Sequence, residues 1–312
     1  MTIMVIGAGS IGTRHFNNLG LLGVKSEAFS MRAGGLTGAL ARIGQGGLAG
    51  VVIATQTQLR LPLIEACAGA GLPVYIEKPL AFDKAELAAI GVAAAPIAAR
   101  SVVGFMMRYH PAFRYLAQAD LSDTYRFSLD IGHDVTQWRQ GWRFADSYAA
   151  MPTGGGVLLD LCHEIDMAAC LFPTATLGPV DSIGHSRYPG VDMATRISLD
   201  GSALGTVSMD YLSPVFTRRI DIAGTGQRHR FDLHAGTYFG GSETEPRLLS
   251  FPFERNEMFL GLMRDFLALI DGRPTSGVAH LPRLDLVQRQ CALIADAYTE
   301  RRFTGHLTGD KP

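Results

Sequence analysis

A glycine-rich string, GAGSIG, follows a short apolar run at the start of the chain. The run Ile3 to Ile6 is too apolar and too short for anything but a buried strand, and Ser10 to Leu22 has helical character. The first glycine permits the tight turn between strand and helix, the second lets the backbone approach a pyrophosphate, and the third lets the helix pack on the strand. Free N–H groups and the dipole at the helix start attract phosphates. The string therefore predicts a dinucleotide-binding turn with contacts at Gly7, Gly9, Ser10, Ile11 and Gly12.

The second predicted strand indicates which dinucleotide binds. In turns of this kind, an acidic residue about 20 positions further on binds the adenosine ribose of NAD. This chain has none there: its second strand, near Lys25 to Met31, ends in Ser30-Met31-Arg32, and Arg32 lies 20 positions after Gly12. A guanidinium pairs bidentately with a phosphate, whereas a carboxylate would repel it. Ser30 and Arg32 therefore favour NADP over NAD, with a solvated surface arginine as the alternative for Arg32.

Composition and length exclude several classes of protein. The 312 residues are 47% hydrophobic and 18% charged, and the formal net charge is -1. This balance gives no reason to expect binding to nucleic acid or to a membrane surface. No segment reaches the roughly 18 uninterrupted apolar residues of a transmembrane helix, and no basic leader precedes the apolar N-terminus. We therefore expect a cytoplasmic protein of two domains, each large enough for its own core.

Apolar runs and helical stretches alternate over the first third of the chain. The runs are Val51 to Ala54, Val74 to Ile76 and Ala98 to Phe105, and the helical stretches between them are Leu59 to Ala70 and Asp83 to Ala94. Such alternation is typical of a doubly wound parallel sheet. The sequence therefore predicts an α/β fold whose dinucleotide-binding domain covers residues 1–105.

The pattern changes after residue 105. Tyr125, Phe127, Leu129 and Ile131 alternate with polar residues, and similar runs recur at Asp192 to Leu199, Ala203 to Met209 and Arg218 to Ile222. This period predicts a large open, mainly antiparallel sheet with one solvated face. Helical stretches at Glu254 to Ile270 and Arg283 to Arg301 close the chain and are candidates to pack back on the first domain.

Residues 106–312 are thus expected to form a second α/β domain that binds substrate and supports oligomerisation. An open sheet with apolar residues on its outer face tends to pair with a copy of itself. We therefore expect a homodimer or a homotetramer.

Longer strings around these features resemble a known family. The chain is similar to the Gfo/Idh/MocA oxidoreductases over nearly its whole length, through GAGSIGTRHFNNL, VVIATQTQ, VYIEKPLA, GFMMRYHPAFR, WRQGWRFADSY and GGGVLLDLCHEID. The first string, the RYHP motif and the segment Trp138 to Tyr148 resemble the branch associated with polysaccharide and sialic-acid-type sugar biosynthesis. The resemblance implies a Rossmann domain, a second domain with a large open antiparallel sheet, and NAD(P)-dependent oxidoreductase activity. It also makes Thr55 a candidate cofactor contact, while Arg60 stands where relatives commonly have a histidine.

The EKP string follows a predicted strand, so Lys78 is expected at the carboxyl end of the parallel sheet, where cofactor and substrate meet. A lysine there can stabilise the charge that develops on a substrate oxygen as a hydride moves. The resemblance implies the same catalytic role for Lys78, and it places Glu77 near the nicotinamide side of the cofactor.

Three glycines, Gly154 to Gly156, precede a predicted helix on which Asp160, His163 and Asp166 are spaced by three residues. Residues at this spacing lie on one face of a helix, about 60° apart around its axis. An imidazole beside a carboxylate is suited to exchange the hydroxyl proton of an alcohol. The resemblance supports His163 as that base, but relatives commonly place the aspartate four residues before the histidine. The role of Asp160 is therefore left open, and a structural histidine–aspartate pair is the alternative.

Metal and thiol chemistry are not expected. The string HEIDM lacks the second histidine of an HExxH motif, and no other histidine or cysteine has the spacing to complete a shell around Asp160 and His163. The four cysteines have no CxxC spacing and lie in apolar surroundings, so we expect them to be reduced and buried; they are Cys67, Cys162, Cys170 and Cys291.

Aromatic and arginine residues before the three glycines indicate a carbohydrate-like ligand. Aromatic rings stack on sugar faces, and guanidinium groups bind carboxylates or phosphates. Arg108, Trp138 and Tyr148 are predicted substrate contacts beside Asp160 and His163, with ordinary packing between domains as the alternative for the first three.

The leading hypothesis is reversible hydride transfer between NADP(H), or NAD(H), and a secondary alcohol or ketone of a sugar, a sugar derivative or a cyclic polyol. The alternatives are an imine or double-bond reductase of the same family and a regulator that binds a dinucleotide without turnover.

Overall fold

The computed structural model describes residues 1–137 and 143–309, which form two compact units. The first unit contains residues 1–110 and 254–292, and the second contains residues 111–253 and the chain from residue 293 onward. No helix among the described residues is both long and apolar enough to cross a membrane.

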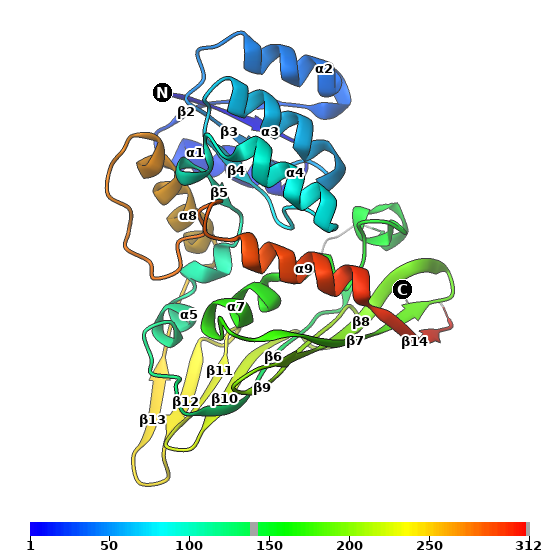
Figure 1. The fold of residues 1–312 in the computed structure, drawn as a ribbon, viewed down its shortest axis with the longest axis vertical. Helices are drawn as coiled ribbons and strands as arrows, with labels where there is room; N and C mark the ends of the chain where they lie inside the picture. Colours follow the sequence, from blue (N-terminus) through cyan, green and yellow to red (C-terminus); the bar gives the residue numbers. More distant parts are fainter. Residues whose placement is uncertain (138–142, 310–312) are drawn as a thin grey trace. The chain divides into compact units, whose positions relative to one another are not determined.

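The first unit is built on a parallel sheet of five strands in the order β2-β1-β3-β4-β5 (Figure 1). The strands are β1 (Thr2–Ile6), β2 (Lys25–Phe29), β3 (Gly50–Ile53), β4 (Val74–Ile76) and β5 (Val102–Val103). All residues of β3, β4 and β5 are buried, as expected for strands covered on both faces, whereas the edge strand β2 is partly exposed. The predicted doubly wound class is confirmed.

Helices cover both faces of this sheet. They are α1 (Ser10–Leu21), α2 (Met31–Gly44), α3 (Arg60–Gly69), α4 (Lys84–Ala94) and α8 (Arg255–Ile270), with 3-10 turns η1 (Thr57–Leu59), η2 (Ala98–Arg100) and η3 (Met106–Tyr109). α8 contacts α1, and Phe266 of α8 meets the ring of Tyr75 on β4 edge to face, with 5.9 Å between ring centroids. A segment far along the chain therefore completes the core beneath the first motif.

The second unit contains a nine-stranded sheet in the order β13-β12-β11-β10-β6-β9-β8-β7-β14. The strands are β6 (Thr124–Gly132), β7 (Thr176–His185), β8 (Tyr188–Asp200), β9 (Leu204–Asp210), β10 (Thr217–Gly224), β11 (Arg228–Asp232), β12 (Thr237–Gly241), β13 (Pro246–Ser250) and β14 (Arg302–Leu307). The β6–β9 and β14–β7 pairs are parallel and the other pairs are antiparallel. The predicted mainly antiparallel sheet is therefore present.

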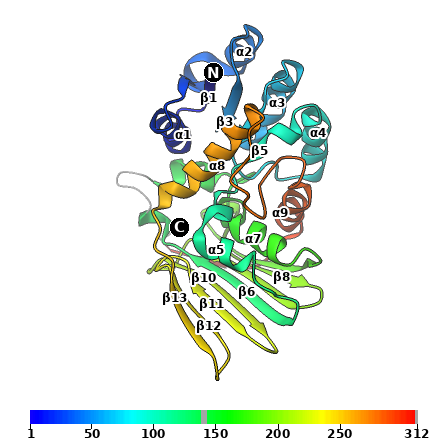
Figure 2. The ribbon, with the colours of Figure 1, turned by 90° about the vertical axis from the view of Figure 1, so that its left-hand side faces the viewer.

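One face of this sheet carries the core of the second unit. Figure 2 shows α5 (Pro111–Leu116) and α7 (His163–Leu171) over that face, and α6 (Val157–Asp160) packs on β8 and β9. Phe127 of β6 stacks on Phe172 with 3.8 Å between ring centroids. Gly205 of β9 lies beneath the ring of Phe127, and a Cβ atom on Gly205 would be 2.2 Å from that ring.

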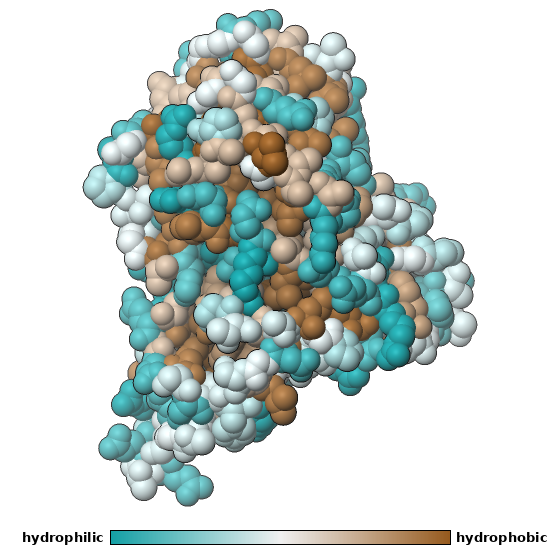
Figure 3. All heavy atoms as spheres, in the orientation of Figure 1, coloured by the Kyte–Doolittle hydropathy of each residue, from teal (hydrophilic) through white to brown (hydrophobic). Residues whose placement is uncertain are grey.

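The other face of the sheet is mixed: it carries many polar and charged residues together with the exposed apolar residues Leu204, Phe239 and Leu248. Its positions include Asp130, Asp181, Arg196, Ser208 and Asp221. Asp181 forms ion pairs with both Arg196 and Arg302. In the space-filling view, the tip of the β12–β13 hairpin is also hydrophilic (Figure 3). Alternation alone shows which residues share a face, but it does not show what covers that face. The predicted homo-oligomer therefore stays a prediction.

Two predicted elements have different bounds in the structure, and one predicted site residue lies on another element. The strand predicted over Ala98 to Phe105 is shortened to β5, because η2 occupies its first residues. The last predicted helix becomes α9 (Gln288–Glu300), which is followed by β14. Arg32 lies in the first turn of α2 rather than on the strand before it.

Candidate active site

The three glycines of the first motif have distinct environments. A Cβ atom on Gly7 would lie 2.4 Å from the carbonyl oxygen of Ala54, and Gly7 has a φ of +122°. A Cβ atom on Gly12 would lie 1.9 Å from the carbonyl oxygen of Gly7. A Cβ atom on Gly9, by contrast, would meet nothing within 4 Å. Gly7 and Gly12 are thus required by the fold, while Gly9 leaves open space at the helix start.

Gly9 is the N-cap residue of α1, and the first turn of α1 has no acidic residue. Its backbone N–H groups and helix dipole therefore form an anion-binding position without a competing carboxylate. Ser10 is exposed and Ile11 is half-buried beside this position. These residues fit the pyrophosphate of a dinucleotide.

The adenosine side of the predicted site is formed by the end of β2. Ser30 is the N-cap of α2 and makes no side-chain capping bond, and Arg32 is exposed in the first turn of that helix. Glu27, the acidic residue of β2, is paired with Arg42 at 2.7 Å. Within residues 1–137 and 143–309, no hydrogen bond or ion pair of Arg32 is found. A cation in the first turn opposes the helix dipole, so Arg32 is not there to stabilise α2.

Glu77 is buried where β4 ends, and it is held from two directions. Its Oε1 lies 2.7 Å from Nε2 of His15 on α1, and its Oε2 accepts a hydrogen bond from the backbone N–H of Lys78 at 3.3 Å. Burial raises the pKa of Glu77, but the hydrogen bond from His15 and the charges of His15, Lys78 and Arg60 outweigh it, so the net pKa is below the ordinary value. Glu77 is therefore an anion in the folded protein.

Arg60 ties together the ends of two neighbouring strands. Its guanidinium donates to the carbonyl oxygen of Thr55 at 3.1 Å and to that of Pro79. Arg60 is 3% exposed, so it is an internal brace rather than a free charge at the cofactor edge. The hydroxyl of Thr55 is buried, and no described residue hydrogen-bonds to it. Lys78 is half-buried beside this brace and is joined to Pro79 by a cis peptide bond.

Arg108 faces the interior of the first unit rather than an open surface. It is 2% exposed and donates to the carbonyl oxygen of His280 at 3.1 Å, and the neighbouring Tyr109 donates to Asp265 at 2.6 Å. These bonds anchor the segment after α8. The position favours the packing alternative for Arg108.

In the second unit, the helix predicted to carry Asp160, His163 and Asp166 is broken. α6 ends at Asp160, Leu161 and Cys162 form a turn, and α7 begins at His163. The three residues therefore do not share one continuous helical face, and regular spacing alone did not predict this break. His163 is 6% exposed at the first position of α7.

Asp160 is held by two tyrosine hydroxyls. Tyr148, which is 49% exposed, donates to its Oδ1 at 2.6 Å, and the buried Tyr211 donates to its Oδ2 at 3.1 Å. Burial, together with the negative charge of Asp160, raises the pKa of Tyr211 well above its usual range, so Tyr211 remains a donor. Tyr148 was predictable from the sequence, but Tyr211 was not, because it follows β9 and carries no local signal. Trp138 lies outside the described residues.

One of the glycines before α6, Gly156, is required by a buried carboxylate. Gly156 has a φ of +100°, and a Cβ atom there would lie 2.0 Å from Oδ1 of Asp192. Oδ2 of Asp192 accepts from the backbone N–H of Leu158 at 2.9 Å, and Tyr298 and Gly154 are joined at 2.8 Å. Burial raises the pKa of Asp192, although the charge of Arg301, 3.6 Å away, opposes this effect. This network fixes the start of the segment that carries Asp160.

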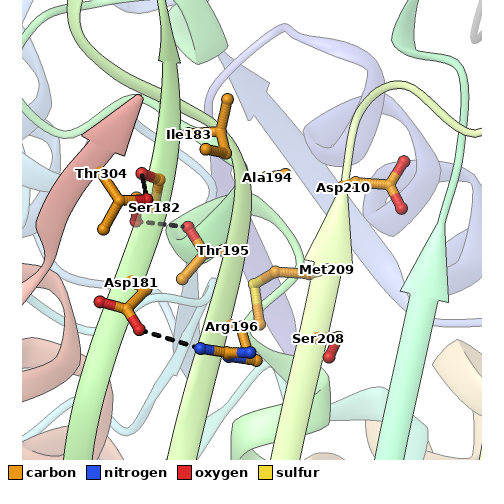
Figure 4. A pocket seen from close by; sticks show the side chains of 10 residues that line it. All are labelled: Asp181, Ser182, Ile183, Ala194, Thr195, Arg196, Ser208, Met209, Asp210 and Thr304. Carbon is orange, nitrogen blue, oxygen red and sulfur yellow. Dashed lines mark hydrogen bonds and ion pairs between the residues drawn. The ribbon is translucent and has the colours of Figure 1, made fainter. Parts of the chain in front are cut away.

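A hollow of about 460 Å³ lies on the outer sheet face of the second unit (Figure 4). Strands β7, β8, β9 and β14 line it, and none of the predicted site residues does. Its polar groups bind one another: Asp181 accepts from Arg196 at 3.1 Å, and Ser182 and Thr195 are 2.8 Å apart. The hollow is therefore a feature of the outer sheet face rather than the candidate active site.

Metal and thiol groups do not add to the site. Within the described parts of the chain, no group of three or more His, Cys, Asp or Glu residues is arranged to hold a metal ion. The four cysteines are free and buried, and burial raises the pKa of Cys67 to about 12. A thiol with such a pKa is not a nucleophile at neutral pH.

Several known oxidoreductases have sequences or folds similar to this chain. No protein-family model matches the chain. Myo-inositol dehydrogenase Hyg17 from Streptomyces leeuwenhoekii is 24% identical over 323 residues, which cover 95% of this chain and 96% of that protein. An oxidoreductase from Agrobacterium radiobacter, solved with NAD+, L-tartaric acid and magnesium, has a TM-score of 0.79 at 16% identity and 96% coverage of both chains. Levoglucosan dehydrogenase with NADH and levoglucosan has a TM-score of 0.74 at 19% identity, also with 96% coverage of both. These structures share the fold of this chain.

Alanine substitutions at Gly9 and Gly12 are expected to affect NADH binding and protein stability differently. Gly9→Ala is expected to weaken NADH binding at least tenfold while the melting temperature stays unchanged, because its Cβ atom meets only the space a pyrophosphate would occupy. Gly12→Ala is expected to lower both the NADH affinity and the melting temperature, because its Cβ atom would collide with the backbone of Gly7. Fluorescence titration with NADH and thermal unfolding measure the two quantities.

Gly20→Ala is the matched control on the same helix, since a Cβ atom there meets nothing within 4 Å. This variant is expected to bind normally and to be slightly more stable, because alanine restricts the unfolded chain. Unchanged NADH binding in Gly9→Ala would contradict the assignment of this turn.

Proposed function

We propose that the chain is a nicotinamide-dependent oxidoreductase. It moves a hydride between the nicotinamide ring and a secondary alcohol or ketone of a sugar, a sugar derivative or a cyclic polyol. The observation that carries this proposal is the carboxyl edge of the parallel sheet, where the open turn at Gly9 follows β1 and Lys78 follows β4. Ligands of open parallel sheets bind outside this edge. The dehydrogenases for myo-inositol and levoglucosan, which resemble this chain, support the substrate class.

The proposed chemistry needs one cation and one base from the chain. Lys78 is the proposed cation, which stabilises the negative charge on the substrate oxygen as the carbon-bound hydrogen leaves with its electron pair. His163 is the proposed base, which takes the hydroxyl proton in oxidation and returns it in reduction. The bound nicotinamide cofactor supplies the hydride acceptor or donor.

Asp160 and Tyr148 are proposed to bind the substrate rather than to take part in the hydride or proton transfer. Asp160 already accepts hydrogen bonds from two tyrosine hydroxyls, which occupies both of its oxygens and supports His163 as the base. Because Tyr148 donates its proton to Asp160, its oxygen is oriented to accept a hydrogen bond from a substrate hydroxyl. The resemblance to the polysaccharide and sialic-acid branch keeps sugar derivatives within the proposed class.

NADP is the proposed preference, although the two structures compared here contain NAD+ and NADH. The support is local: an exposed Arg32 stands against the helix dipole next to Ser30, and the acidic residue of β2 is paired with Arg42. A 2′-phosphate would accept from both Ser30 and Arg32.

Substitution of the two proposed catalytic groups tests the function. Purified protein is assayed for reduction of NAD+ and NADP+ with myo-inositol, glucose and related polyols. Lys78→Met and His163→Ala are each expected to lower kcat by roughly 10²- to 10⁴-fold, the usual contribution of such groups. Lys84→Met and His306→Ala, at exposed positions, are the controls and are expected to retain wild-type activity.

Other outcomes identify other functions. Activity on imines or carbon–carbon double bonds that survives His163→Ala would indicate a reductase in which His163 is dispensable. Tight cofactor binding without turnover on any polyol would indicate a regulator and would contradict the proposal.

Arg32→Ala is expected to weaken NADPH binding about tenfold or more and to leave NADH binding nearly unchanged, since only NADPH carries the 2′-phosphate. Parallel titrations of wild type and variant with both cofactors measure this. Equal effects on NADH and NADPH would contradict the NADP preference, and Lys25→Ala, at an exposed position of β2, controls for a general loss of positive charge there.

A further inference from the structure

His15 is a fully buried histidine within the first motif, and the proposed mechanism does not use it. It lies on α1, three residues after Gly12, and its side chain is 0% exposed. Its ring packs against Tyr75 of β4 at 4.6 Å and Phe259 of α8 at 6.2 Å between ring centroids. Its Nε2 lies 2.7 Å from Oε1 of Glu77. A polar side chain is thus enclosed by the core with one charged partner.

The charge of Glu77 determines the direction of its hydrogen bond with His15. Because Glu77 is ionised, its oxygens only accept, so Nε2 of His15 carries the donated proton. Nδ1 of His15 is buried, and no described residue hydrogen-bonds to it. The contact with Glu77 is therefore the only hydrogen bond that the ring makes to the described residues. The charged groups around Glu77 are His15, Lys78 and Arg60.

The other oxygen of Glu77 reaches the backbone that carries the proposed catalytic lysine. Oε2 accepts from the backbone N–H of Lys78, and Gly104, at the end of β5, leaves the space that Glu77 needs. A Cβ atom on Gly104 would lie 3.0 Å from Oε2. One chain of hydrogen bonds therefore runs from the side chain of His15 through Glu77 to the backbone of Lys78.

We propose that His15 is a positioning residue for Lys78. Its imidazole holds the Glu77 carboxylate, and Glu77 holds the turn after β4 in the conformation that presents the lysine. Because His15 is on the helix whose first turn faces the dinucleotide, the lysine is fixed relative to the cofactor-binding helix. This inference rests on the proposed function, in which Lys78 acts on the substrate oxygen.

Three substitutions at one position test the proposal. His15→Leu removes the donor with similar bulk, His15→Asn has an amide too short to reach Glu77, and His15→Gln places an amide N–H near the position of Nε2. His15→Leu and His15→Asn are expected to lower kcat about 10²-fold, the cost of a displacement of about 1 Å at a catalytic group. NADH affinity is expected to change much less, and His15→Gln is expected to recover most of the lost kcat. Asn17→Ala, on the exposed face of α1, is the control.

Hydrogen exchange of the segment Glu77 to Leu80 is measured in the same proteins. It reports the hydrogen bond from the Lys78 backbone N–H to Glu77 and does not require catalytic turnover. Faster exchange there in His15→Leu and His15→Asn, reversed in His15→Gln, is expected. If kcat and the exchange rate both stay at the wild-type level in His15→Leu and His15→Asn, the proposed role of His15 is overturned. If kcat, NADH affinity and melting temperature all fall together in the three variants, His15 serves only to pack the core, and the positioning role is overturned. Absence of turnover in the wild type would instead contradict the proposed function, while the exchange result would still decide the hydrogen-bond chain.

Discussion

The first unit depends on how closely the backbone of α1 approaches the turn before it. A side chain at Gly12 would strike the carbonyl oxygen of Gly7, and one at Gly7 would strike Ala54 beyond β3. This contact sets the position of the helix against β1 and β3, and two consequences follow along α1. Its first turn opens at Gly9 with unpaired backbone donors, and one turn later its buried face brings His15 to Glu77. The anion-binding end and the EKP turn are therefore parts of one packed element.

In the second unit, buried polar groups hold the segment before His163. Asp192 occupies the space that Gly156 leaves, binds the N–H of Leu158 and lies near Arg301, while Tyr211 links the carbonyl of Gly156 to Asp160. Buried polar networks of this kind specify a unique conformation only when their members are paired. The short helices α6 and α7 are too brief to be stable alone, so these bonds and the sheet beneath determine their positions.

Features that depend on neighbouring residues were predictable from the sequence. The turn from Gly7 to Gly12 and the strand before Glu77 follow from local pattern, and the structure has both. Features that depend on distant partners were not predictable. The brace from Arg60 to Pro79, the bond from His15 to Glu77 and the donation from Tyr211 to Asp160 join segments far apart in the chain.

The same limit explains the errors in the predicted second unit. Spacing by three residues placed Asp160 and His163 on one helix, but spacing does not reveal the turn at Leu161 and Cys162. Likewise, alternation along the strands predicted a sheet with one solvated face, but it did not show that polar and apolar side chains share that face.

Hydride transfer from a carbon-bound hydroxyl group is the central claim, and isotope transfer tests it most directly. The protein is incubated with NAD+ or NADP+ and perdeuterated myo-inositol or perdeuterated glucose, and the recovered cofactor is analysed by mass spectrometry. The account predicts a reduced cofactor that carries one deuterium from the sugar carbon. A cofactor that remains oxidised with every polyol, or that is reduced with hydrogen from the solvent alone, would contradict it.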